Sequence, residues 1–122
     1  MIPFTHKKLK VWEKSIDFST EIYRVSKQFP RDELYGITSQ MRRAAISIPS
    51  NIAEGYGRRS EKEKYRFLCF ALGSASEIET QLIMCFQLGY IDDEVYNDLI
   101  NRLSEIIKML SSLADTVNEC LK

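Results

Sequence analysis

The chain has 122 residues, of which 44% are hydrophobic and 28% charged, and its 17 Lys and Arg balance 17 Asp and Glu. A chain of this size forms one domain whose single core needs no disulfide or metal to hold it together. Five Gly and three Pro are too few for the many turns of an all-β fold, so the composition favours helices.

Cysteine usage and hydropathy bear on the compartment. Cys69, Cys85 and Cys120 are far apart, form no C-x-x-C pair and leave one thiol unpaired in any disulfide scheme. We interpret them as reduced core thiols. No apolar stretch approaches the roughly 18 residues of a membrane span, and the first residues lack the apolar run of a signal peptide. We therefore expect a cytoplasmic protein with no membrane segment.

The charges are unevenly distributed along the chain. Residues 1–66 hold 14 Lys and Arg against 8 Asp and Glu, whereas residues 67–122 hold 3 against 9. The two parts therefore carry +6 and −6. This asymmetry indicates either a basic binding surface or two oppositely charged parts that pack together within or between subunits.

Residues 7–28 form the first predicted helix. Two adjoining and mainly apolar stripes follow helical spacing, one with Leu9, Trp12, Ile16, Ser19 and Tyr23 and the other with Phe18, Ile22, Val25 and Phe29. The resulting apolar face is wider than the roughly 100° arc that a bundle helix needs, which indicates contact with more than one neighbour. Pro30 ends the helix, because the residue before a proline is pushed out of the α region.

Residues 32–56 form the second predicted helix, with one apolar side made of Leu34, Ile37, Met41, Ala44, Ala45, Ile48 and Ile52. Pro49 lies inside this segment and cannot donate a hydrogen bond to the carbonyl of Ala45. We therefore expect a kink between Ala45 and Pro49. Gly55 and Gly57 mark the end of the helix.

Two more helices follow, each with a clear start signal. The sequence Ser60-Glu61-Lys62-Glu63 has the spacing of a capping box and predicts a helix from Ser60 to about Leu88-Gly89. The acidic run Asp92-Asp93-Glu94 suits the start of another helix. Its apolar stripe is the most regular in the chain and consists of Leu99, Leu103, Ile106, Leu110, Leu113 and Val117.

Four helices with short connections pack as antiparallel neighbours. The sequence therefore predicts an all-α fold, an antiparallel up-down-up-down four-helix bundle, as a single domain over residues 1–122.

The sequence offers little for catalysis. His6 is the one histidine, so the pattern contains no His-based triad, no His/Cys metal cluster and no di-iron Glu-x-x-His pair. Gly55-Tyr56-Gly57 follows a predicted helix rather than a strand, which argues against a nucleotide-binding loop. We expect no enzymatic activity, no cofactor and no metal site.

A polar stripe runs beside the apolar one on the second predicted helix and continues on the third. Its members are Gln40, Arg43, Ser47, Asn51, Glu54, Ser74 and Glu77. We interpret it as a structural network that fixes helix register, in which Arg43 pairs with Glu77 or Glu54 inside the bundle. The alternative interpretation is a polar cleft that binds a ligand.

A basic set extends from the second helix to the start of the third and includes Arg42, Arg58, Arg59, Lys62, Lys64 and Arg66. With Tyr56 and Tyr65 nearby, these side chains are candidates for contacts with RNA or DNA phosphates. Glu61 and Glu63 are interleaved with them and favour an ordinary solvated helix start instead.

Several motifs together resemble those of a known family. They are LKVW at residues 9–12, FP at 29–30, ELYG at 33–36, QMRRAAISIPSNIAEG at 40–55, GR at 57–58, ALGS at 71–74 with Glu77 and Glu79, and LGYI at 88–91. On these residues the chain resembles the small bacterial proteins encoded by intervening sequences of 23S ribosomal RNA genes. The motifs span nearly the whole chain.

The resemblance implies a four-helix bundle that assembles into a ring, typically a homopentamer, with no known enzymatic activity. An accessory protein of diversity-generating retroelements is related to this family and binds a reverse transcriptase and nucleic acid through a basic surface. The chain differs from that relative in its net charge of zero. We therefore expect a scaffold or protein-interaction module that binds itself and possible protein partners. A weak, sequence-independent RNA- or DNA-binding accessory factor is the alternative.

Overall fold

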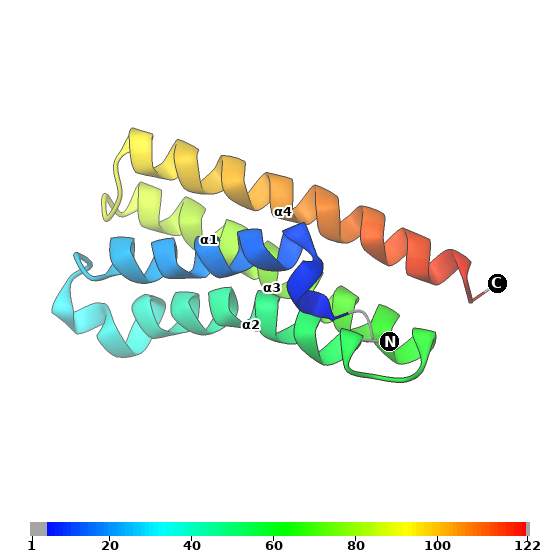
Figure 1. The fold of residues 1–122 in the computed structure, drawn as a ribbon. Helices are drawn as coiled ribbons and strands as arrows, with labels where there is room; N and C mark the ends of the chain where they lie inside the picture. The colour runs from blue at the N-terminus through cyan, green and yellow to red at the C-terminus, as the bar shows by residue number, and fades with distance from the viewer. Residues whose placement is uncertain (1–4, 122) are drawn as a thin grey trace.

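The computed structural model describes residues 5–121 and shows four α-helices, each antiparallel to the next (Figure 1). They are α1 (Lys10–Ser26), α2 (Ser39–Tyr56), α3 (Glu61–Gln87) and α4 (Asp93–Glu119). The predicted all-α four-helix bundle is confirmed. Residues 1–4 lie outside the described part. The expectation of no signal peptide and the predicted domain over residues 1–122 both include them. No helix within residues 5–121 combines the length and the apolar character that crossing a membrane requires.

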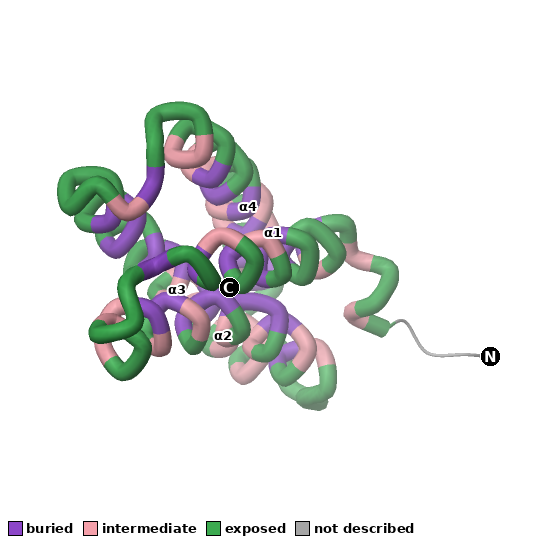
Figure 2. Tube along the Cα trace, turned by 90° about the vertical axis from the view of Figure 1, so that its left-hand side faces the viewer, coloured by how far each residue is buried: buried purple, intermediate pink, exposed green. Residues whose placement is uncertain are grey.

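The helices surround one core to which each contributes a single face, as the purple segments in Figure 2 show. Its largest fully buried side chains are Phe18, Ile22, Met41, Ile48, Ile52, Leu68, Ile78, Leu82, Leu99, Leu103, Ile106 and Leu110. In the predicted α4 stripe only Leu113 is half-buried, and the other five members are buried. α1 and α3 each pack against both α2 and α4. The α1/α2 and α3/α4 pairs therefore form opposite edges of the bundle.

Local sequence signals set the ends of α3 and α4. The Ser60 hydroxyl accepts a hydrogen bond from the Glu63 amide at 3.0 Å, and Asp92 accepts one from the Val95 amide at 2.9 Å. Both predicted helix starts are confirmed. α3 ends at Gln87, and Gly89, just beyond it, has a φ of +78° that lets the Tyr90 amide donate a hydrogen bond back to the Cys85 carbonyl at 2.9 Å. This is a Schellman end, and glycine suits its left-handed residue.

The predicted helix over residues 7–28 is shorter in the structure. His6–Lys8 form a separate 3-10 turn, and α1 begins at Lys10 and ends at Ser26. Leu9 has extended backbone angles (φ −80°, ψ 125°) and separates the turn from the helix. The apolar spacing does not mark this break, because Leu9 is compatible with either element.

The predicted helix over residues 32–56 is interrupted near its start. Arg31–Glu33 form a 3-10 turn, Leu34–Thr38 a wider π-type turn, and Gly36 is non-helical (φ −111°, ψ −119°). At Gly36 a Cβ atom would lie 2.9 Å from the Glu33 carboxylate. A residue without a side chain therefore suits this position. From Ser39 onward α2 continues through Pro49, which is buried.

Close packing between α2 and α3 depends on Gly55. It is buried in the last turn of α2, and a Cβ there would lie 3.0 Å from the Cβ of Phe67. The helix ends at Tyr56, next to Gly57, so the predicted helix end is confirmed.

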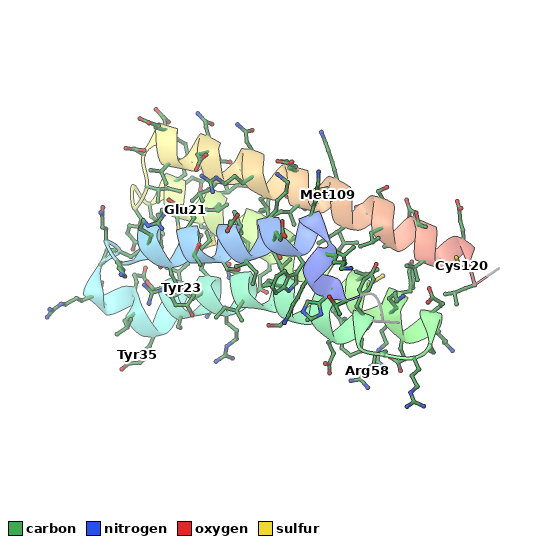
Figure 3. All side chains as sticks on the ribbon, in the orientation of Figure 1. Glu21, Tyr23, Tyr35, Arg58, Met109 and Cys120 are labelled. Atoms are coloured by element: carbon green, nitrogen blue, oxygen red, sulfur yellow. The ribbon has the colours of Figure 1, made fainter. Side chains whose placement is uncertain are left out.

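The expected core position of the cysteines holds for Cys85 alone. Cys69 is half-buried, and Cys120 is exposed at the end of α4, where the helix projects past its neighbours (Figures 1 and 3).

Candidate functional site

The structure separates the predicted basic set into two places. Arg58, labelled in Figure 3, lies at the turn between α2 and α3, where the chain also places Arg59, Lys62, Lys64 and Arg66. Arg42 lies near the opposite end of α2, where its Nε donates to the Ser26 hydroxyl at 2.8 Å and its guanidinium covers the Tyr23 ring at 4.7 Å. Arg42 therefore belongs to the junction of α1 and α2 and not to the same surface.

Carboxylates accompany most of the basic side chains at the α2–α3 turn. Ion pairs join Arg58 to Glu54 at 2.8 Å, Lys64 to Glu61 at 3.1 Å and Arg66 to Glu63 at 3.4 Å. Among the described residues, Arg59 and Lys62 have no ion pair within 4 Å. The turn consequently offers a weaker positive field than its count of cations indicates.

Aromatic rings organise the same turn. Arg58 lies 5.0 Å from the centre of the Phe67 ring, Arg66 lies 5.3 Å from that of Phe70, and the Lys64 ammonium lies 4.6 Å from that of Tyr56. Burial and, to a smaller extent, the nearby charge of Glu61 raise the pKa of Tyr56. These stacked cations are held against the protein surface rather than extended into solvent.

The predicted polar network is present only in part. The Ser47 and Ser74 hydroxyls lie 2.7 Å apart and join α2 to α3, and the Asn51 amide donates to the Ser47 hydroxyl at 2.8 Å. The prediction that Arg43 pairs with Glu77 or Glu54 inside the bundle is wrong. Arg43 is exposed, and Glu54 pairs with Arg58 instead. The 3.6-residue period of the helix predicted that Arg43 lies beside the core. In the structure its side chain lies on the solvent-exposed side of α2.

The other predicted members of that stripe lie on the surface. Gln40, Glu54 and Glu77 are exposed. Gln40, Arg43, Ser47, Ser74 and Glu77 line an open polar hollow of about 490 Å³ between α2 and α3, together with Tyr35, Ser39 and Ala44. The polar stripe thus forms a solvated seam whose floor is the Ser47–Ser74 pair.

An apolar groove lies between α1 and α2. It encloses about 490 Å³. Its hydrophobic lining, called the α1/α2 groove below, consists of Trp12, Ile16, Tyr23, Ile46, Pro49 and Ala53. Ile16, Tyr23 and Ile46 remain 36%, 37% and 44% exposed. Large apolar side chains gathered in one hollow are typical of an interaction surface.

The sequence predicted the apolar residues that α1 contributes to this groove and missed the contribution of α2. The first apolar stripe of the first helix includes Trp12, Ile16 and Tyr23, and the width of the two stripes together indicated a second contact. Ile46 was missed because it lies outside the core-facing period of its helix, next to Ser47. The sequence did contain one signal of this contact, namely an isoleucine outside the core-facing period of the helix.

The chain is a small all-α helical bundle in which four antiparallel helices surround one core. Its surface carries an exposed apolar groove and a turn of mixed charge. Within that class, the chain belongs to the 23S rRNA-intervening sequence protein family, whose pattern it matches over residues 7–112.

A solved structure of similar fold comes from Bacteroides thetaiotaomicron, a protein of unknown function from the S23 ribosomal protein family. It is 29% identical to this chain, with a TM-score of 0.80 over 86% of this chain and 95% of the other. No curated protein matches.

Proposed function

We propose that this protein is a non-enzymatic, cytoplasmic homo-oligomer that acts as a scaffold or protein-interaction module. The observation that carries the proposal is the α1/α2 groove. Covering the exposed part of each of its large apolar side chains contributes about 1 kcal/mol, given roughly 1.5–3 kcal/mol for complete burial. A ring of five subunits is the expected assembly, on the strength of the family resemblance.

Charge distribution supports the same proposal. The net charge of the chain is zero, while the parts before and after residue 66 carry +6 and −6. A neutral protein with separated charges repels its own copies weakly and offers them complementary surfaces.

A nucleic-acid-binding accessory role is the second candidate, favoured by Arg59 and Lys62, which have no ion pair among the described residues. The other cations of the α2–α3 turn already have carboxylate partners, so self-association has the stronger support.

Light scattering coupled to size exclusion tests the proposal. The wild-type protein is expected to have a mass several times the 14.2 kDa of one chain. Ile46→Glu places a charge in the groove and should yield monomers, and its circular dichroism melting curve checks that the bundle is intact. Phe70→Glu is the matched control, because Phe70 is 45% exposed but lies outside the groove. A wild-type protein that stays monomeric at micromolar concentrations would refute the proposal.

A further inference from the structure

A second exposed apolar surface lies on the edge of the bundle opposite the groove. Phe86 of α3 stacks on Tyr96 of α4 with ring centres 4.6 Å apart. Ile83 and Ile100 lie one helical turn from these rings on the same sides of α3 and α4. Ile83 is 40% and Phe86 38% exposed, and the other two are half-buried. Ile83, Phe86, Tyr96 and Ile100 are called the α3/α4 edge below.

The shapes of the two surfaces suit each other better than either suits itself. A two-fold contact through the groove would place one hollow against another and leave unfilled space, whereas protein interfaces pack as densely as interiors. Ile83 and Phe86 project from a helix pair, and side chains of this kind fill a hollow between two other helices. Groove against edge therefore gives the closer fit.

The charges around the two surfaces are opposite. The hollow that shares Tyr23 and Ile46 with the groove is lined by Arg42 and Arg43, and the next hollow toward the α1–α2 connection by Lys27, Arg31 and Arg42. Neither lining contains Asp or Glu. The first turns of α4, which hold Tyr96 and Ile100, carry Asp93, Glu94 and Asp98 against Arg102. Opposite charges beside two apolar surfaces direct them toward each other rather than toward their own kind.

The α3/α4 edge is level with only one end of the α1/α2 groove. Tyr90, between α3 and α4, bonds to Glu33, between α1 and α2, so both connections meet at one end of the molecule (Figure 1). Near this end the Cys85 sulfur lies 4.0 Å from that of Met41, which places Phe86 level with the start of α2. Tyr23, at the near end of the groove, is level with Arg42, whereas Trp12 and Ala53 lie about two to three turns further along the bundle. Contact between groove and edge therefore requires neighbouring subunits to be shifted or tilted along the bundle.

We infer that the α1/α2 groove binds the α3/α4 edge of a second copy of this chain. The inference rests on the proposed self-association and specifies its partner surfaces. A contact between two different surfaces is heterologous, so an open chain of subunits keeps one free groove and one free edge until a ring closes. Two chains alone cannot satisfy both surfaces.

Complementation between two variants tests this arrangement. Ile46→Glu blocks the groove and Ile83→Glu blocks the edge, and both positions are exposed enough for the fold to tolerate glutamate. Each variant alone should be monomeric. An equimolar mixture should form a 1:1 dimer, twice the 14.2 kDa of one chain, through the intact groove of one variant and the intact edge of the other. Phe70→Glu should assemble like the wild type, and native mass spectrometry distinguishes these species.

The outcomes separate this inference from the proposal beneath it. A monomeric wild type contradicts self-association itself. An oligomeric wild type together with an Ile83→Glu variant that assembles normally overturns the heterologous contact alone. A wild type that stops at a dimer, or a mixture in which both variants remain monomeric, overturns it as well.

Discussion

The Ser19 hydroxyl of α1 lies 2.8 Å from the Ala45 carbonyl of α2, the carbonyl that Pro49 leaves without its helical hydrogen bond. The same hydroxyl lies 2.8 Å from the Ser15 carbonyl, so its single hydrogen is shared between two helices. Ser19 and Pro49 are both buried. A side chain from the neighbouring helix thus replaces the donor that proline lacks, which explains how α2 continues through Pro49.

Ser19→Ala should destabilise the bundle by about 1–3 kcal/mol, because it leaves the buried Ala45 carbonyl without this donor. Pro49→Ala restores an amide at position 49 that can donate to that carbonyl. In the Pro49→Ala background the cost of Ser19→Ala should therefore fall. Urea unfolding of the four proteins of this double-mutant cycle measures the difference. Equal costs in both backgrounds would show that the hydroxyl does not substitute for the missing amide.

Two glycines in helix interiors should respond oppositely to alanine. Gly55→Ala places a methyl group 3.0 Å from the Cβ of Phe67 and 3.3 Å from the Lys64 carbonyl. Overpacking of this kind costs about 1–3 kcal/mol. A methyl group at Gly73 would meet no other helix within 4 Å, so Gly73→Ala should stabilise α3 by about 0.5–1 kcal/mol through its helix propensity. Thermal unfolding checks both, and a stabilising Gly55→Ala would contradict the close α2–α3 approach.

The structural features that were predicted correctly from the sequence depend on local or periodic patterns. Ser60 and Asp92 act within three residues of themselves, and the stripe from Leu99 to Val117 repeats every three or four residues. The errors required knowledge of a neighbouring helix. Nothing near Pro49 in the sequence reveals that Ser19 donates to the carbonyl that Pro49 leaves unpaired, and the kink expected there stays a prediction. The break at Gly36 was missed because the apolar spacing from Leu34 to Met41 continues through it.

The candidate site shows the same limit. A wide apolar face on the first helix predicted an additional contact, but the groove also needs Ile46 from α2, which only the packing of the two helices brings to it. The basic residues were likewise grouped by their order in the sequence. This grouping placed Arg42 with Arg58, although the two lie near opposite ends of α2. Periodicity predicts which side of a helix is apolar, and only the assembled bundle decides which polar residues meet.

Stability at alkaline pH should depend on Tyr90. Its hydroxyl donates to the Glu33 carboxylate at 2.7 Å, and this bond, with burial and the charge of Glu33 as smaller causes, raises the pKa of Tyr90 from 10.0 to about 12. The folded state thus favours the protonated phenol. The contribution of the Tyr90 hydroxyl to the free energy of unfolding is complete below pH 10 and is lost as the pH rises from 10 to about 12.

Melting temperatures of the wild type and Tyr90→Phe between pH 8 and 12 test this dependence. Tyr90→Phe should melt at a lower temperature at pH 8, and the gap should narrow toward pH 12. Burial raises the pKa of the Cys85 thiol to about 11, so that group titrates in the same range in both proteins. The comparison between variants removes the part of its contribution that does not depend on Tyr90. A gap that is constant across the range would show that the Glu33 bond does not depend on the Tyr90 proton.

Binding of nucleic acid should be weak and should depend on Arg59 and Lys62. Each phosphate neutralised contributes a slope of about −0.9 in log affinity against log salt for duplex DNA and about −0.7 for single strands. Two available cations at the α2–α3 turn therefore predict a slope of roughly −1.4 to −1.8 per subunit. We expect sequence-independent binding that is measurable near 50 mM salt and falls steeply toward 200 mM, on the same dependence.

Fluorescence anisotropy with a labelled RNA short enough to contact one subunit measures this slope. Reversal of Arg59 and Lys62 to Glu should abolish binding, whereas Arg58→Ala should have a smaller effect, because Arg58 is already paired with Glu54 at 2.8 Å. If the slope instead approaches the roughly −3.5 to −4.5 of five phosphate contacts, the ion pairs at this turn open on binding, and the accessory-factor role gains support. If no binding occurs at low salt, the ion pairs neutralise the turn as the geometry indicates, and the α1/α2 groove and α3/α4 edge remain as the surfaces through which this protein acts.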